Sequence, residues 1–162
     1  NIQLVHNQCE DVGYETMGKG GQIQWDFDNK KFPLEDNSVG VFHAFHTLQK
    51  HPDKIHIMRE IYRVCADFAW VFIEVPSTKG PGAFSDPSHR SFWNKDTFLY
   101  YTSERSGKYA GVENEKFQCW RLEEVVPEEQ GGDIWCTQAW LTCVKSDNYR
   151  CGELDYSDMR QN

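Results

Sequence analysis

The feature that most constrains the fold is a pair of short apolar runs separated by an amphipathic helix pattern, within residues 32–75. Residues 39–45 are almost all β-branched, aromatic or small apolar, which is typical of a strand covered on both faces of an α/β sheet. From Asp53 onward apolar residues recur at helical spacing, and a second apolar run at residues 70–75 stops at Pro76. This order predicts a βαβ unit with parallel strands and a right-handed crossover.

The remaining sequence predicts an antiparallel end to the same sheet. Residues 22–27 alternate apolar and polar side chains, as expected for a strand with one buried face. Residues 77–93 are rich in Gly, Pro, Ser and Asp and predict a long loop, after which Asn94 caps a short helix. Residues 117–126 and 134–144 predict two strands, and the short connection between them favours an antiparallel hairpin.

Length and composition indicate one folded domain with less regular ends. The chain has 162 residues, of which 39% are hydrophobic and 26% charged, an ordinary globular composition. Residues 1–21 carry few apolar positions and are expected to be irregular or a poorly formed edge element. Residues 22–145 are expected to form the domain, and residues 146–162 a loosely ordered polar tail. Since the sequence begins with Asn1, we expect a processed product or a part of a longer polypeptide.

The charge and hydropathy exclude several classes of partner. A net charge of −8 argues against binding a phosphate backbone, because such binding relies on clustered Lys and Arg. No run approaches the roughly 20 apolar residues that span a bilayer, and the N-terminus lacks a signal-peptide pattern. We therefore expect a soluble, cytoplasmic protein that binds neither nucleic acid nor membrane.

The six cysteines show no metal-ligand spacing such as CxxC. Cys65 and Cys143 stand in apolar surroundings, which is typical of buried free thiols and favours a reducing compartment. The even count leaves a disulfide open, with Cys119 and Cys136 as the pair if their strands are neighbours.

Four segments carry a resemblance to a known family. They are FPLEDNS at residues 32–38, MREIYRV at residues 58–64, EVP at residues 74–76 and GPGAFSDPSHRSFW at residues 80–93. The first three resemble the second half of a class I S-adenosylmethionine (SAM)-dependent methyltransferase, and the last resembles a loop of small bacterial and phage methyltransferases. The resemblance covers residues 22–144. It implies a Rossmann-like α/β methyltransferase sheet that is N-terminally incomplete and ends in an antiparallel hairpin.

The resemblance also implies where SAM would bind. It places Asp28, or less favourably Asp26, beside the adenine, where a carboxylate at a strand end accepts a hydrogen bond from the amino group. It places His46 and Leu48 in the segment that faces cofactor and substrate. The alternative for the two aspartates, a solvated turn, is left open.

The loop at residues 80–93 carries the candidate catalytic residues. His89 is a candidate general base for a substrate hydroxyl, because an imidazole accepts a proton near neutral pH, and Asp86 is a candidate to orient it. The alternative is that both side chains hydrogen-bond the loop to itself.

A metal site is not expected from the histidines. Strand alternation places His43 and His46 on opposite faces. No Cys or carboxylate stands at a matching spacing, and zinc needs three or four converging ligands. The set in question is His43, His46, His51 and His56.

Several positions depart from the family pattern. The glycine-rich cofactor loop has no counterpart, since the glycine run at residues 18–21 precedes a predicted strand instead of following one. The family's Pro-Gly-Gly turn is replaced by residues 67–69, Asp-Phe-Ala, and its Leu-Glu-His by residues 48–50, Leu-Gln-Lys. Gly40 replaces an Asp and lies inside a predicted strand.

The sequence leaves two main functional hypotheses. The leading hypothesis is SAM-dependent methyl transfer to a small-molecule, sugar or lipid acceptor. The alternative is a catalytically inactive methyltransferase-like domain that serves as a structural or interaction module. A nucleotide-sugar or NAD-binding enzyme ranks last, because its fingerprint is missing. Strands missing from the N-terminal side would expose a sheet edge, which predicts a protein partner, a homo-oligomer or a larger assembly.

Overall fold

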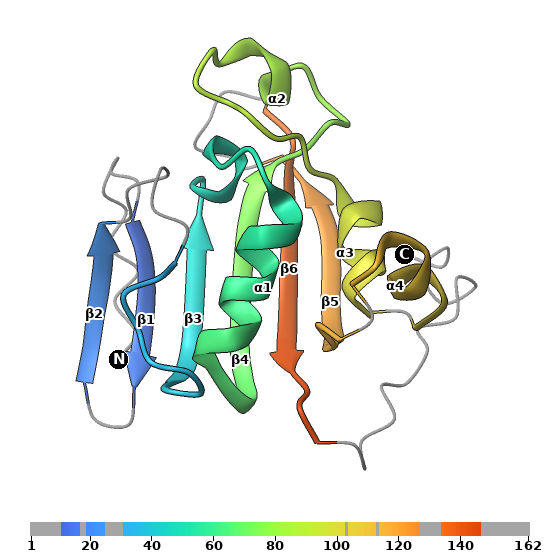
Figure 1. Cartoon of the computed structure of the whole chain (residues 1–162). Coiled ribbons are helices and arrows are strands. Elements are labelled where there is room, and N and C mark those ends of the chain that lie inside the picture. The colour runs from blue at the N-terminus through green and yellow to red at the C-terminus, as the bar shows by residue number, and fades with distance from the viewer. Residues whose placement is uncertain are drawn as a thin grey trace.

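A computed structural model describes residues 11–16, 19–24, 31–102, 104–112, 114–126 and 134–146. They form one six-stranded sheet with the strand order β2-β1-β3-β4-β6-β5 (Figure 1). Helices α1 and α3 lie side by side on one face. In chain order the elements are β1 (Asp11–Thr16), β2 (Lys19–Gln24), β3 (Val39–Phe45), the 3₁₀ helix η1 (Leu48–Lys50), α1 (Lys54–Val64), β4 (Cys65–Pro76), α2 (Gly82–Ser85), α3 (Lys95–Thr102), α4 (Glu104–Ala110), β5 (Phe117–Val125) and β6 (Cys136–Cys143).

The predicted βαβ unit is confirmed. Strands β3 and β4 pair in parallel, with α1 as the crossover. Helix α1 begins where the sequence predicts, because the Asp53 side chain caps it by accepting a hydrogen bond from the His56 backbone N–H at 2.9 Å. The apolar stripe of α1 faces the sheet and includes Ile57, Met58 and Ile61, all fully buried.

Two departures from the family pattern correspond to irregular backbone. The pairing of β1 with β3 shifts register because Glu15 and Thr16 pair with Val41 and Val39, so Gly40 is the extra residue of a β-bulge, where glycine is common. Phe68 has φ 62° and is 51% exposed. This left-handed conformation suits glycine and strains a residue with a side chain.

The C-terminal hairpin is also confirmed. Strand β6 pairs antiparallel with both β4 and β5. The proposed disulfide is wrong, because Cys119 and Cys136 are free thiols. Their strands are neighbours, but Cys136 pairs with Val125, six residues along β5 from Cys119, or about 20 Å at about 3.3 Å per residue. Disulfides require Cα atoms within about 7 Å.

The N-terminal part differs from the prediction. Residues 1–21 were expected to be irregular or a poorly formed edge element, and the structure places the antiparallel hairpin of β1 and β2 at the edge of the sheet, where β1 pairs antiparallel with β3. The strand expected at residues 22–27 begins earlier and ends at Gln24. Strand β3 is therefore paired on both sides, so the expected open edge does not lie at β3. Residues 25–30 and the tail from residue 147 lie outside the described part.

The core lies between the sheet and α1 and α3. Its largest fully buried side chains include Trp93, Phe42, Phe98 and Phe117, and each contributes on the order of 2–3 kcal/mol through burial. Among the described residues, no helix covers the other face of the sheet (Figure 1). The described part of the chain contains no helix with the length and apolar character needed to cross a bilayer.

One arginine holds the turn before β3. It lies at the edge of the sheet where β3 and β4 begin, the amino edge, and the opposite edge, where they end, is the carboxyl edge. The Arg63 guanidinium donates to the Phe32 and Leu34 carbonyls and to the carboxylates of Glu60 and Asp36. Glu60 in turn accepts a hydrogen bond from the Phe32 backbone N–H at 2.8 Å. No member of this network is among the buried side-chain atoms without a partner in the described residues, so packing and hydrogen bonding explain the sequence FPLED at residues 32–36.

Candidate functional site

The candidate site lies at the carboxyl edge of β3 and β4. His46 follows β3 directly with φ 51°, a left-handed conformation that is uncommon outside glycine and is found at functional sites. Its backbone N–H donates to the Glu74 carbonyl at 2.9 Å, so β4 holds the strained residue in place. The end of β3 is thus turned toward β4 at the edge where open α/β sheets bind ligands.

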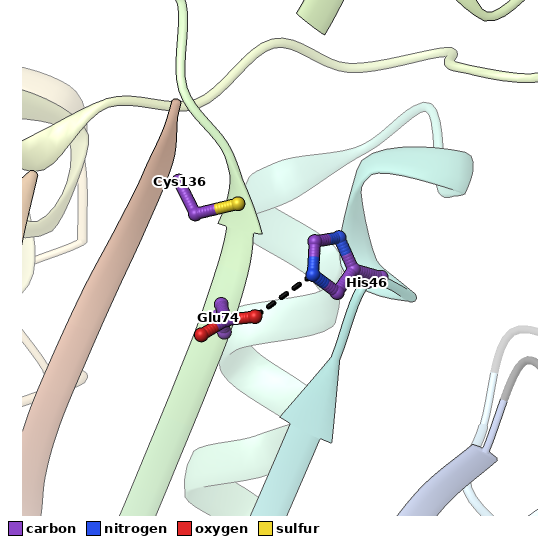
Figure 2. A group of neighbouring side chains, drawn as sticks. All are labelled: His46, Glu74 and Cys136. Atoms are coloured by element: carbon purple, nitrogen blue, oxygen red, sulfur yellow. Dashed lines mark ion pairs between the residues drawn. The ribbon is translucent and has the colours of Figure 1, made fainter. Parts of the chain in front are cut away.

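His46, Glu74 and Cys136 converge at this edge (Figure 2). The imidazole, carboxylate and thiol donor atoms all lie within 4.8 Å of one another. Glu74 comes from β4, and Cys136 opens β6, where it pairs with Pro76. Gln138 donates to Glu74 Oε2 at 2.5 Å and fixes the other carboxylate oxygen.

Burial and neighbouring carboxylates alter the ionisation and hydrogen bonding of this cluster. Burial, followed by the nearby charges of Glu74 and Glu124, raises the pKa of the Cys136 thiol to about 12. His46 Nε2 lies 2.8 Å from Glu74 Oε1, which is an ion pair when the imidazole is protonated (Figure 2). Apart from this ion pair, the buried nitrogen has no hydrogen-bond partner among the described residues.

The loop predicted at residues 77–93 crosses above this edge and carries α2 (Figure 1). Its ends are fastened, since Ser77 N–H donates to the Trp135 carbonyl and Thr78 N–H to the Trp93 carbonyl. A Cβ at Gly80 would lie 2.5 Å from the Trp135 ring, so only glycine fits there. The loop is a fixed cover over the strand ends.

Helix η1 joins this loop to β3. The Gln49 carbonyl accepts hydrogen bonds from the Arg90 and Ser91 backbone N–H groups. Leu48, predicted to contact the cofactor, is fully buried in the core. Gln49 is 3% exposed, and its Oε1 has no hydrogen-bond partner. Gln49 is thus the member of this segment with an unused polar atom.

The structure places the two candidate catalytic residues in one turn of the loop. His89 Nδ1 lies 2.8 Å from the Ala83 carbonyl, which can only accept, so Nδ1 carries the hydrogen. Nε2 lies 3.6 Å from Asp86 Oδ2, and the His89 side chain is only 7% exposed. Hydrogen bonds from Ser88 hold the pKa of Asp86 below its usual value. Both side chains thus bind within their own loop, as the alternative expects.

Asp26 and Asp28, the predicted adenine contacts, lie outside the described residues. Strand β2, which precedes them, ends at Gln24 opposite Asp11, at the carboxyl edge of β3.

Among the described residues, the four histidines are not brought together as one group of donor atoms. His51 and His56 stack on one another with ring centroids 5.8 Å apart, and His43 packs against Phe45. Sequence reasoning missed Glu74 and Cys136. One signal was available for Glu74, a lone carboxylate within an apolar strand.

Two hollows lie away from this cluster. One of about 500 Å³ at the amino edge is lined by charged side chains that include Arg59, Glu60 and Arg63. The other, of about 350 Å³, lies between α1 and α3 and is lined by Tyr100 and Tyr101, among others. Neither hollow contains the convergent donor atoms of His46, Glu74 and Cys136. We therefore take the carboxyl edge, where these atoms meet at the ends of the strands, as the candidate functional site.

Comparison with known proteins shows the fold. No family model and no curated protein matches the chain. Among solved structures, a SAM-dependent methyltransferase from Aquifex aeolicus is similar, with TM-score 0.50 and 19% identity over 76% of this chain and 55% of that one. The cyclase SpnF is similar with TM-score 0.50 and 12% identity over 75% of this chain and 55% of that one. A SAM-dependent methyltransferase from Methanosarcina mazei has a TM-score of 0.49 and 15% identity over 75% of this chain and 66% of that one. The chain thus spans less than two thirds of the length of each.

Proposed function

We propose that this chain, which has the fold of class I SAM-dependent methyltransferases, belongs to a SAM-dependent enzyme. The proposed acceptor is an oxygen or nitrogen of a small molecule, sugar or lipid. Fold similarity alone does not assign an activity. The observation that carries the proposal is the set of unsatisfied polar atoms beneath a fastened loop, at the edge of the sheet where such folds bind ligands.

The described residues fit part of the cofactor. Gln49 Oε1 is a buried acceptor for an amino or hydroxyl hydrogen of SAM, and His46 lies at the same edge. Strand β1 does not supply the glycine-rich loop, because Thr16 pairs with Val39 and β1 therefore ends at the amino edge. Asp26 and Asp28 remain the proposed adenine contacts. The rest of the cofactor site would come from further chain or from a partner.

His89 is the proposed proton acceptor. SAM, when bound, supplies an electrophilic methyl group, so the protein has to position the acceptor and remove its proton. With Nδ1 donating to Ala83, the lone pair of His89 lies on Nε2. A proton taken there would be stabilised by the Asp86 carboxylate, 3.6 Å away.

A second function, an inactive structural or interaction module, is favoured by one observation. Strand β1, which takes the place beside β3, runs antiparallel to it and ends at the amino edge, so it does not lead into a cofactor loop at the carboxyl edge. A domain that had lost SAM binding would retain the sheet and its helices without this loop.

Isothermal titration with SAM and S-adenosylhomocysteine separates the two functions. The enzyme proposal expects saturable binding at micromolar ligand, weakened at least about tenfold in His46→Ala and Asp28→Ala, with His56→Ala as the matched control. Loss of one or two ligand hydrogen bonds accounts for a change of this size. His89→Gln should retain binding and lose transfer once an acceptor is found. Absence of binding at millimolar ligand would favour the module.

A further inference from the structure

The convergence of His46, Glu74 and Cys136 is not explained by the proposed methyl transfer. It combines one nitrogen, one oxygen and one sulfur donor from three different strands or strand ends, all within 4.8 Å. Zinc and similar divalent transition metals accept this mixture of donors, whereas magnesium and calcium require oxygen ligands. From this geometry we propose that the cluster binds one divalent transition-metal ion, with Zn²⁺ as the best match.

The free state of the cluster supports this assignment. His46 Nε2 is buried without a hydrogen-bond partner, although a carboxylate oxygen lies 2.8 Å away. A buried polar atom left unsatisfied costs about 1–3 kcal/mol, so native proteins retain few of them. A metal ion bound to Nε2 would remove this cost. The left-handed backbone of His46 stores further strain in aiming the ring at the cluster.

The charges favour a divalent cation. A thiolate at Cys136 and the Glu74 carboxylate carry two negative charges, which a 2+ ion neutralises when His46 binds as neutral imidazole. Divalent metal ions bind the thiolate form of cysteine, so binding should release the thiol proton.

The donor atoms, all within 4.8 Å of one another, need only small shifts to bind a metal. Donors bound at about 2.0–2.3 Å in a tetrahedron are about 3.3–3.7 Å apart. His46 Nε2 and Glu74 Oε1 are 2.8 Å apart, so the carboxylate has to turn away by about half an ångström on metal binding. Gln138 holds the other carboxylate oxygen and acts as a supporting partner outside the ligand shell.

Three protein ligands leave a fourth coordination position open. Closed structural zinc sites have four protein ligands, whereas open sites admit water or a small ligand. The three residues lie at the carboxyl edge of β3 and β4, the edge over which the loop with α2 crosses (Figure 1). An oxygen, nitrogen or sulfur atom of a small molecule would take the fourth position. This inference does not depend on SAM binding, and it is tested with metal alone.

Cobalt(II) titration of the reduced chain is the test. We expect one equivalent to bind, with a near-ultraviolet thiolate-to-cobalt charge-transfer band and tetrahedral d–d bands. Cys136→Ser should abolish the charge-transfer band, and Cys119→Ser, a buried thiol outside the cluster, should retain it. His46→Ala and Glu74→Gln should weaken binding at least about 100-fold, and Gln138→Ala about tenfold. His56→Ala is the histidine control.

X-ray absorption of the zinc-loaded, unmodified chain gives an answer even if Cys136→Ser does not fold. We expect one sulfur scatterer at about 2.3 Å and nitrogen or oxygen scatterers at about 2.0 Å. Two or more sulfur scatterers, none at all, or cobalt binding that Cys136→Ser leaves unchanged would overturn the proposal. So would the absence of stoichiometric binding to the folded chain. A negative SAM titration would leave the metal proposal intact.

Discussion

The two edges of the sheet differ in how completely their polar groups are paired. At the amino edge Arg63 bonds to two carboxylates and two carbonyls, and each of these groups has a partner. At the carboxyl edge three buried side-chain atoms have none, on His46, Gln49 and Glu124. In the described residues only one other side chain has such an atom, Glu115, which lines the hollow at the amino edge.

This difference separates stability from function. A network with every partner in place holds the fold, and removing one member leaves a buried charge. Buried atoms without partners are costly, and several of them at the edge where such sheets bind ligands mark a candidate binding site. We infer that the family-like sequence at residues 32–36 and 58–64 is retained for folding, and that the carboxyl edge is the binding edge.

The largest expected effect comes from breaking the amino-edge network. Arg63→Ala should lower the free energy of unfolding by about 3 kcal/mol, because it leaves the buried Glu60 carboxylate without its cation. Urea denaturation measures the change. Arg121→Ala, which removes an exposed ion pair with Glu123, should cost at most about 1 kcal/mol. Equal effects of the two changes would contradict the structural role of the network.

Loosening the cover over the carboxyl edge should have the next largest effect. Gly80→Ala places a methyl group 2.5 Å from the Trp135 ring and should destabilise the fold by about 1–3 kcal/mol. It should also weaken ligand binding at this edge. Gly82→Ala, whose nearest neighbour would lie at 3.1 Å, is the milder control. Thermal unfolding of both variants gives the comparison, and an unaffected Gly80→Ala would show that the loop moves freely.

His46 and Phe68, two of the three non-glycine residues with a left-handed backbone in the described part of the chain, sharpen the comparison. Phe68→Gly should raise the free energy of unfolding by about 1 kcal/mol, since glycine relieves the φ of 62°. His46→Gly should relieve similar strain but abolish cobalt binding. If Phe68→Gly also abolished metal binding, stability at the amino edge and binding at the carboxyl edge would not be independent.

The smallest effect is a dependence on acid. Although burial opposes it, hydrogen bonds from Arg63 and Phe32 hold the pKa of Glu60 below its usual value of 4.5. The group therefore contributes stability above about pH 4.5, and this contribution is lost as the pH falls through the lowered pKa. Glu60→Gln should flatten that part of the stability curve measured by urea denaturation. If the free energy of unfolding fell with pH in Glu60→Gln as it does in the unmodified chain, the ion pair of Glu60 with Arg63 would not contribute to stability.

The sequence predicted the parts of the fold that depend on local pattern. The βαβ unit, the helix capped by Asp53 and the C-terminal hairpin are confirmed, because periodicity and turn residues specify them. The class I methyltransferase fold is confirmed by the solved structures. The β1–β2 hairpin was missed because residues 11–21 have few apolar positions and are fixed by pairing with β3.

The candidate site was predicted only in part. His46 was identified from the family pattern, and it does lie at the carboxyl edge. Glu74 and Cys136 were missed because only the pairing of β4 with β3 and β6 brings them to His46. Strand register is a property of the folded sheet, and no spacing in the sequence encodes these three residues as a set.

The most direct test of the binding edge is an amide NMR titration of the folded chain, with S-adenosylhomocysteine and with Zn²⁺ in separate samples. If ligands bind at the carboxyl edge, the amide chemical shifts of His46, Gln49, Glu74 and Thr137 should change. Those of Asn37 and Arg63 at the amino edge should stay the same. Shifts confined to the amino edge, or no shifts with either ligand, would contradict binding at the carboxyl edge.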